Sequence, residues 1–172
     1  IEGWKRLDEL TVGAHLALPR HLSGLGQAQT MTNDELALLG HLIGDGCVLP
    51  RHAIQYTTRE EDLATLVSQL ATNVFGSEVS PRVSQERNWY QVYLSSTRHH
   101  THNVRSAVSE WFEDLGIFGL RSYEKRIPEK LFAQPAEAIA LFLRHLWVTD
   151  GCIRLRTTDK QLYSAVYYAP SS

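Results

Sequence analysis

The sequence of 172 residues has only two cysteines, Cys47 and Cys152, too few for a disulfide framework or a four-ligand zinc site. It has no apolar run near the roughly 18 residues of a membrane span, and it starts with neither Met nor a secretory signal. These absences predict a protein of the reducing cytoplasm with no membrane partner. The missing Met leads us to expect a part of a longer chain.

Neither sign of charge is in excess, because 17 Lys and Arg face 19 Asp and Glu. The whole chain is therefore not an obvious polyanion binder, and any nucleic-acid surface must be local. The hydrophobic content of 43% excludes a disordered tail and is sufficient for a domain core.

The apolar pattern predicts an α+β domain in which helices alternate with pairs of strands. Thr32-x-x-Glu35 and Thr58-x-x-Glu61 have the form of capping boxes before apolar runs. We expect helices over 33–44, from Thr58 to Gly76, over 103–115 and over 136–148, and strands at 48–49, 53–56, 79–83, 89–94, 152–156 and 162–168. Residues 1–26 are expected to form irregular β structure. The predicted segments are 1–27, 28–134 and 135–172.

Two segments 105 residues apart end in the same way, as an apolar helix that terminates in Asp-Gly-Cys at Asp45 and Asp150. One copy alone is best explained as a turn after a core helix. Two copies in the same setting indicate a duplicated unit with a pseudo-twofold axis. Cys47 and Cys152 are interpreted as small buried strand residues rather than metal ligands.

The two acids stand in an unfavourable position, because a helix C-terminus carries partial negative charge. A divalent cation would offset this charge, and Mg²⁺ needs only one or two protein carboxylates beside water and phosphate oxygens. We expect Gly40 and Gly44 to permit close helix packing, so that Asp45 and Asp150 meet at a shared seam. Carboxylates that hold metal ions beside a phosphate suit phosphodiester hydrolysis.

Segments 38–46 and 143–151 resemble the two dodecapeptide motifs of LAGLIDADG homing endonucleases. The second departs from the pattern at Arg144, His145 and Trp147, where small or aliphatic residues are usual. The resemblance implies an αββαββα unit followed by an incomplete second unit. It also implies that Asp45 and Asp150 are catalytic acids that bind Mg²⁺. The motif positions expected to serve packing are Gly40, Gly44, Gly46 and Gly151.

Lys125-Arg126-Ile127-Pro128 resembles the Lys-x-Ile-Pro segment of endonucleases carried by inteins, whose lysine is assigned an active-site role. From the residues alone, Lys125 is also explicable as an exposed lysine in a basic connector. The resemblance implies that Lys125 is catalytic, where it would orient a water or stabilise phosphate charge.

The flanks resemble an intein. Residues 1–13 are similar to a stretch of the Hint splicing domain, and residues 162–172 to the strand after the second motif. The nearest resemblance is to inteins of bacterial replicative DNA helicases. It implies as partners double-stranded DNA at the insertion site and the host exteins or the remaining intein segments. The splicing residues (an N-terminal Cys or Ser, a Thr-x-x-His block and a terminal His-Asn) are absent, so we expect no splicing by this chain.

Candidate DNA contacts come from residues 81–130, where eight Lys or Arg face six acids, and from Arg and Gln on strands or turns. Such side chains read guanine and adenine in the major groove, although each is also explicable as part of a solvated sheet face. His99 and His100 are interpreted as loop residues rather than zinc ligands. The candidates are Arg51, Gln55, Gln85, Arg87, Gln91, Arg126, Arg154 and Arg156.

Three functions stay open at this point. The chain is part of a Mg²⁺-dependent, site-specific endonuclease within an intein, or a related DNA-binding domain that does not cut, or a passive insertion in a splicing element.

Overall fold

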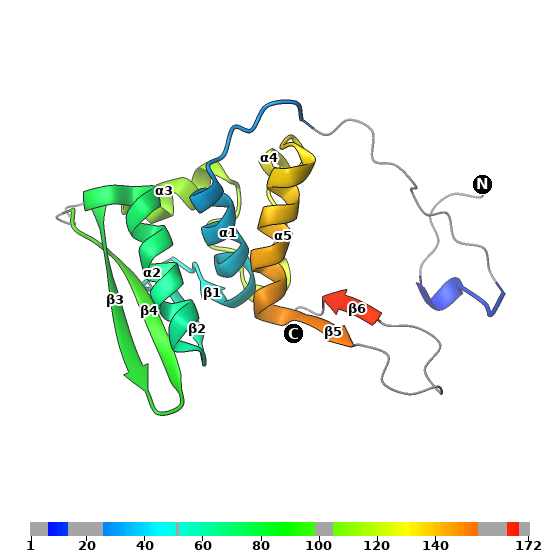
Figure 1. Ribbon diagram of the computed structural model, residues 1–172, viewed down its shortest axis with the longest axis horizontal. Coiled ribbons are helices and arrows are strands. Elements are labelled where there is room, and N and C mark those ends of the chain that lie inside the picture. Colours follow the sequence, from blue (N-terminus) through cyan, green and yellow to red (C-terminus); the bar gives the residue numbers. More distant parts are fainter. Residues whose placement is uncertain (1–6, 14–25, 51, 99–104, 155–164, 169–172) are drawn as a thin grey trace.

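The computed structural model describes residues 7–13, 26–50, 52–98, 105–154 and 165–168 (Figure 1). Its central elements follow one another as helix, two strands, helix, two strands, helix, which confirms the predicted α+β class and the αββαββα order. They are α1 (Asn33–Asp45), β1 (Gly46–Cys47), β2 (Gln55–Thr58), α2 (Glu61–Phe75), β3 (Val79–Glu86), β4 (Trp89–Ser96) and α3 (Ala107–Asp114).

A second set of elements begins after a basic connector and repeats only the start of this order. It consists of α4 (Glu129–Phe132), α5 (Ala136–Asp150), β5 (Gly151–Arg154) and β6 (Ala165–Tyr168). Short 3₁₀ helices lie at Leu7–Glu9, Gly76–Glu78 and Ser122–Glu124. No helix in the described part of the chain is long and apolar enough to cross a membrane.

The first unit has a four-stranded antiparallel sheet in the order β1-β2-β4-β3. Tyr56 of β2 lies directly opposite Val92 of β4, and both are fully buried, so this face of the sheet meets α1 and α2. Strands β5 and β6 form a separate antiparallel pair. Figure 1 shows the two sheets on opposite sides of the adjacent helices α1 and α5.

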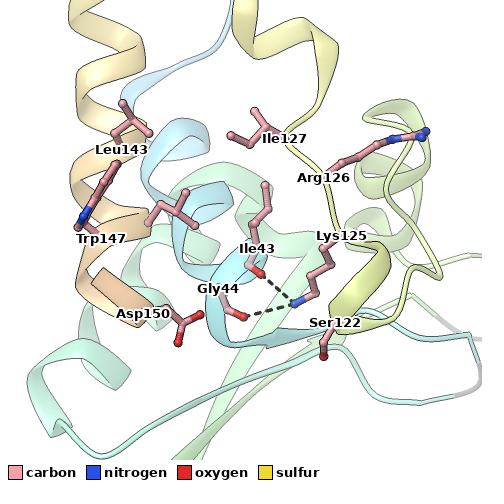
Figure 2. A pocket seen from close by; sticks show the side chains of 10 residues that line it. Ile43, Gly44, Ser122, Lys125, Arg126, Ile127, Leu143, Trp147 and Asp150 are labelled. Atoms are coloured by element: carbon pink, nitrogen blue, oxygen red, sulfur yellow. Dashed lines mark hydrogen bonds between the residues drawn. The ribbon is translucent and has the colours of Figure 1, made fainter. Parts of the chain in front are cut away.

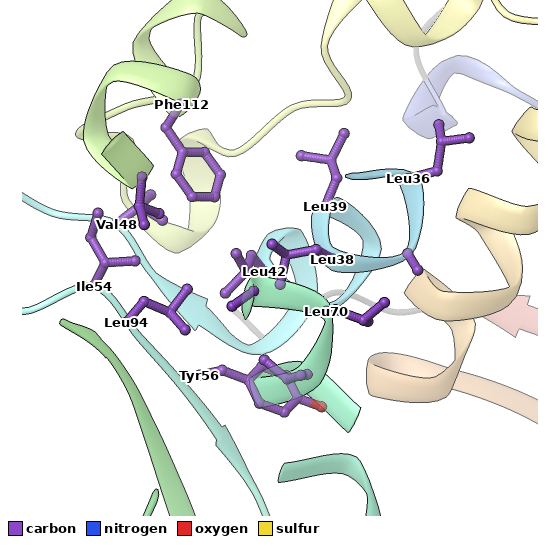
Figure 3. Packing of buried hydrophobic residues seen from close by; sticks show 14 of the residues in the cluster. Leu36, Leu38, Leu39, Leu42, Val48, Ile54, Tyr56, Leu70, Leu94 and Phe112 are labelled. Atoms are coloured by element: carbon purple, nitrogen blue, oxygen red, sulfur yellow. The ribbon is translucent and has the colours of Figure 1, made fainter. Parts of the chain in front are cut away.

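Helix α1 is the centre of the core, because it packs against α2, β2 and α5 at once. Every residue from Leu36 to Leu42 is buried, which explains why this helix is apolar all round rather than along one stripe. Figure 3 shows Leu38, Leu39 and Leu42 among the side chains of the sheet and of α3.

The two predicted capping boxes have different outcomes. Thr32 accepts a hydrogen bond from the backbone N–H of Glu35, and the Glu35 carboxylate accepts one from the N–H of Thr32, as predicted. The prediction at Thr58 was wrong, because Thr58 is a buried residue of β2 whose hydroxyl accepts from the N–H of Glu60. Helix α2 therefore begins one turn later, at Glu61, without a side-chain cap.

Other boundaries also differ from the prediction. The first strand of the hairpin is Gly46–Cys47 rather than 48–49, because the chain enters the sheet directly after α1. In the described residues 7–13 the chain forms a 3₁₀ turn and no strand, contrary to the irregular β structure predicted there. Helix α3 begins at Ala107 rather than at residue 103. Ser106 is its N-cap, and the Ser106 hydroxyl accepts a hydrogen bond from the backbone N–H of Ser109. Of the predicted strands 152–156 and 162–168, residues 155–156 and 162–164 lie outside the described residues.

Gln134 joins the segment before α1 to the start of α5. Its buried amide oxygen accepts hydrogen bonds from the N–H groups of Thr30 (2.9 Å) and Met31 (3.2 Å), and its nitrogen donates to the Thr30 hydroxyl (2.7 Å). These bonds satisfy a polar group that would otherwise be costly to bury. Segments more than 100 residues apart in the sequence are thereby fixed together.

Candidate active site

The two acids of the repeat lie at equivalent places in the fold. Asp45 is the last residue of α1 and Asp150 the last residue of α5, and each is followed by a glycine that begins a strand. A Cβ on Gly46 would lie 2.8 Å from Cα of Leu42, and a Cβ on Gly151 would lie 2.6 Å from Cγ of Trp147. The glycines therefore let each strand turn back tightly against its own helix.

The helix seam is built from pairs of residues that are equivalent under the repeat. Gly40 faces His145, and Gly44 faces Thr149, in each case 105 positions further on. A Cβ on Gly40 would lie 2.9 Å from Cβ of His145, and one on Gly44 would lie 2.6 Å from Cβ of Thr149. His145 and Thr149 of α5 thus each face a glycine of α1, which explains how α5 packs closely despite the histidine in its motif.

Two hollows flank the end of this seam, and the repeat relates them. One, of about 250 Å³, is lined by Ile43, Gly44 and Asp150. The other, of about 430 Å³, is lined by their equivalents Val148, Thr149 and Asp45. Each acid therefore faces a hollow of its own, as a pseudo-twofold axis between α1 and α5 requires.

Lys125 lies in the smaller hollow at the end of α1. Its half-buried ammonium donates hydrogen bonds to the carbonyl oxygens of Ile43 (3.0 Å) and Leu42 (3.2 Å), and further bonds to those of Gly44 and Gly46. Figure 2 shows this ammonium at the helix end, with Asp150 in the same hollow. A cation here satisfies carbonyls that have no partner within the helix and opposes the negative end of its dipole.

The charges of this site act on one another. Burial first, and then the negative charge of Asp150, raise the pKa of Asp45 above its ordinary value, while Lys125 lowers it. Burial lowers the pKa of Lys125, against the opposing effects of Cys47 and the two acids. Burial also raises the pKa of Tyr56 to about 12, with Asp45 as the second cause. Lys125 is thus the cation that opposes the effect of burial and of Asp150 at Asp45.

The donor set at the seam fits a hard divalent cation. Two half-buried carboxylates lie close enough to repel each other, and carboxylate oxygens are ligands that Mg²⁺ prefers. No group of three or more His, Cys, Asp and Glu suited to a metal occurs among the described residues. Such a closed cage is not needed by Mg²⁺, which commonly keeps waters and phosphate oxygens.

The candidate DNA contacts do not share one surface, and those on the strands lie on both faces of the sheet. Gln55 lies opposite Tyr93, and Gln91 opposite Ser84, on the face turned away from the buried Tyr56 and Val92. Gln85 lies opposite Tyr90, on the same face as Val92. Arg87 occupies the β3–β4 turn with a φ of 54°, and Arg126 lines the smaller hollow. Arg51 and Arg156 lie outside the described residues, as does the side chain of Arg154.

One residue of the open face was missed by the sequence analysis. Arg82 lies opposite Tyr93, with its guanidinium carbon 4.7 Å from the centre of the Tyr93 ring. The Tyr93 hydroxyl in turn donates a 2.5 Å hydrogen bond to the side chain of Gln91. The sequence could have indicated Arg82, because alternate residues of a strand share one face and Arg82, Ser84 and Glu86 are alternate polar residues of β3.

The fold and site define an α+β unit in which a duplicated helix end brings two carboxylates together. The chain is homologous to segments of replicative DNA helicase DnaB. It is 60% identical to the protein of Rhodothermus marinus over 99% of this chain, and 60% identical to that of a Nostoc species over 100% of it. The chain spans 18% and 19% of these relatives. It is also 28% identical to a segment of protein RecA of Mycobacterium tuberculosis, over 96% of this chain and 22% of that protein.

No protein-family model matches the chain. Among solved structures it is similar to mesophilic variants of the homing endonuclease I-DmoI, with a TM-score of 0.45 and 16% identity over 70% of this chain and 62% of that one.

Proposed function

We propose that the chain is part of an intein that is inserted in a replicative DNA helicase and encodes a site-specific DNA endonuclease dependent on Mg²⁺. The observation that carries this proposal is the pairing of Asp45 and Asp150 at the ends of two packed, repeat-related helices. Support for an insertion comes from the recurrence of this segment in proteins as different as DnaB and RecA.

In this proposal each residue of the site has a distinct role. Asp45 and Asp150 would hold Mg²⁺, which when bound supplies charge stabilisation for hydrolysis of the phosphodiester. Lys125 would hold the end of α1 in place and keep positive charge beside the phosphate.

The open face of the first sheet would contact the DNA. Gln55, Gln91 and Arg82 present polar groups there at the spacing of alternate strand residues, and such groups read base edges in the major groove. Other proposed contacts are Arg51, Arg87, Arg126, Arg154 and Arg156, whereas Gln85, a candidate from the sequence, lies on the opposite face. The proposed partners are the double-stranded DNA of the insertion site and the host helicase exteins.

A cleavage experiment tests the proposal. The substrate is DNA that spans the uninterrupted helicase gene at the insertion junction, incubated with Mg²⁺ or with chelator. Both this chain and the longer protein that contains it are tested. We expect cutting at the junction that requires Mg²⁺. Specific binding without cutting by either protein would instead show a DNA-binding domain, and neither binding nor cutting would show a passive insertion.

A further inference from the structure

A chain of hydrogen bonds through the buried His41 crosses the seam between α1 and α5 before the acids. His41 of α1 is fully buried, and its Nε2 lies 3.1 Å from Nδ1 of His145 on α5. On its other side, Nδ1 of His41 lies 3.3 Å from the hydroxyl of Tyr56 on β2. The two imidazole rings meet edge to face, with centroids 5.1 Å apart. The chemistry proposed for the acids uses neither histidine.

The seam is shaped to admit this contact. His145 occupies the position that repeats Gly40, and the absence of a side chain on Gly40 gives the His145 ring room to reach His41. Other α5 residues at the seam, such as Phe142 and Leu146, are apolar, and apolar packing alone specifies the axial register less sharply. A hydrogen bond weakens steeply once its distance and angle depart from a narrow range. The His41–His145 contact is therefore a directional contact between the two helices near the acids, in addition to the Gln134 hydrogen bonds at their N-terminal ends.

This contact lies close to the acids along both helices. Asp45 follows His41 by four residues, and Asp150 follows His145 by five, which is about 6 Å and about 7.5 Å along the helix axes. A slide of α5 along α1 would displace the two acids relative to each other along the helix axes by the length of the slide. It would also break the imidazole bond.

We propose that His41 and His145 are positioning residues whose hydrogen bond sets the register of α1 against α5 and thereby the separation of Asp45 and Asp150. Tyr56 anchors His41 from the sheet. The expected effect on cleavage rests on the proposed endonuclease function, whereas the expected effect on the register of the two helices does not.

Proton positions allow the bond in two forms. In the first form, the Tyr56 hydroxyl donates to Nδ1 of His41, and Nε2–H of His41 donates to Nδ1 of His145. In the second form, Nδ1–H of His145 donates to Nε2 of His41, and Nδ1–H of His41 donates to the Tyr56 hydroxyl oxygen. One added proton, on Nε2 of His145, is still compatible with the second form. Protonation of both rings would place two N–H groups face to face. Burial first, and then the charge of Arg144 beside it on α5, lower the pKa of His145.

The test compares two substitutions of His145 that differ in hydrogen bonding. His145→Leu removes the bond, whereas His145→Asn places an amide near the position of Nδ1 and can restore it. His52→Leu, at an exposed histidine, is the matched control. Two measurements are made on each folded variant: single-turnover cleavage and affinity on the junction DNA, and the separation of nitroxide labels on Cys47 and Cys152. These are the only cysteines, both are free and partly exposed, and each lies two residues beyond an acid.

We expect His145→Leu to slow cleavage at least tenfold with DNA affinity within about twofold of the parent, and to broaden the distribution of label separations. His145→Asn should recover most of both properties, and His52→Leu should match the parent. Parent-like cleavage and label separation in His145→Leu would overturn the proposal. Equal losses in His145→Leu and His145→Asn would also overturn it, because His145 would then act by packing alone.

The two proposals fail in different ways. If the parent protein does not cut the DNA, the proposed function fails, and the label separations alone decide whether the histidine bond sets the register. If the parent cuts and Asp45→Asn does not, while His145→Leu cuts normally, only the positioning role is lost.

Discussion

The ammonium of Lys125 donates a 3.0 Å hydrogen bond to the carbonyl oxygen of Ile43, across 82 positions of sequence. This bond places a cation at the same helix end that carries the Asp45 carboxylate. The sequence predicted that a positive charge must offset this acid and assigned the task to a metal ion. The structure shows that Lys125 already contributes part of it, as a cap of the α1 carbonyls.

Lys125→Met should therefore destabilise the metal-free fold. The substitution removes charge-assisted bonds to the end of α1 and leaves half-buried carbonyls with fewer partners, so we expect the free energy of unfolding in urea to fall by about 1–3 kcal/mol. Lys130→Met, at an exposed lysine of α4, is the control and should change it by under about 0.5 kcal/mol. Equal stability of the two variants would show that the cap contributes nothing.

In cleavage, Lys125→Ala should slow the single-turnover rate more than it weakens DNA binding, because the lysine lies in the hollow with Asp150. The comparison is rate against affinity on one DNA substrate. The reverse order of effects would make Lys125 a phosphate anchor instead.

Asp45→Asn should stabilise the metal-free protein at pH 7. The pKa of Asp45 is raised in the fold by burial and by Asp150, so its ionisation at neutral pH opposes folding. The rise in Tm should shrink as the pH falls and vanish below the ordinary carboxyl pKa of about 3.9, where the acid is protonated in both states. Asp114→Asn, at the exposed end of α3, is the control and should have a smaller effect. A fall in Tm on Asp45→Asn would contradict this electrostatic account.

The buried His41 should make stability depend on pH in a defined window. Burial first, and then His145, lower its pKa from 6.5 to about 4. Between these values the unfolded chain binds a proton that the fold excludes, so stability is lost as the pH falls through the window, by roughly 3 kcal/mol in total. Urea unfolding at pH 7, 5.5 and 4 measures this. Removal of the titrating group in His41→Gln should flatten the dependence, and an unchanged slope would show that His41 does not titrate there.

The two faces of the first sheet can be distinguished by DNA affinity. Gln91 lies on the open face beside Tyr93, whereas Gln85 lies on the face of Val92. If the open face contacts DNA, Gln91→Ala should weaken specific binding by about 5–100-fold, the range expected for loss of a bidentate base contact, and Gln85→Ala should have little effect. The opposite result would place the DNA on the other face.

The alternation of helices and strands could be predicted because α1, α2, α3 and α5 are apolar runs or carry a periodic apolar face, and each ends within two residues of a glycine. The repeat of Asp45 and Asp150 was likewise visible as two equal helix endings. Thr58 was misassigned because a capping pattern is local, whereas pairing of Thr58 with Tyr90 across the sheet is not. The same limit hid the buried roles of His41 and Gln134, since each has a hydrogen-bond partner more than 100 residues away.

The most direct test of the account is to measure cleavage and affinity together on the junction DNA for the parent, Asp45→Asn, Asp150→Asn and the control Asp114→Asn. The account predicts that both active-site variants bind within a few-fold of the parent, because phosphate contacts dominate affinity, yet do not cut in Mg²⁺. It also predicts that the control cuts normally. Cutting by either active-site variant, or equal loss of binding and cutting in a folded one, would contradict the assignment of the paired acids as the metal site.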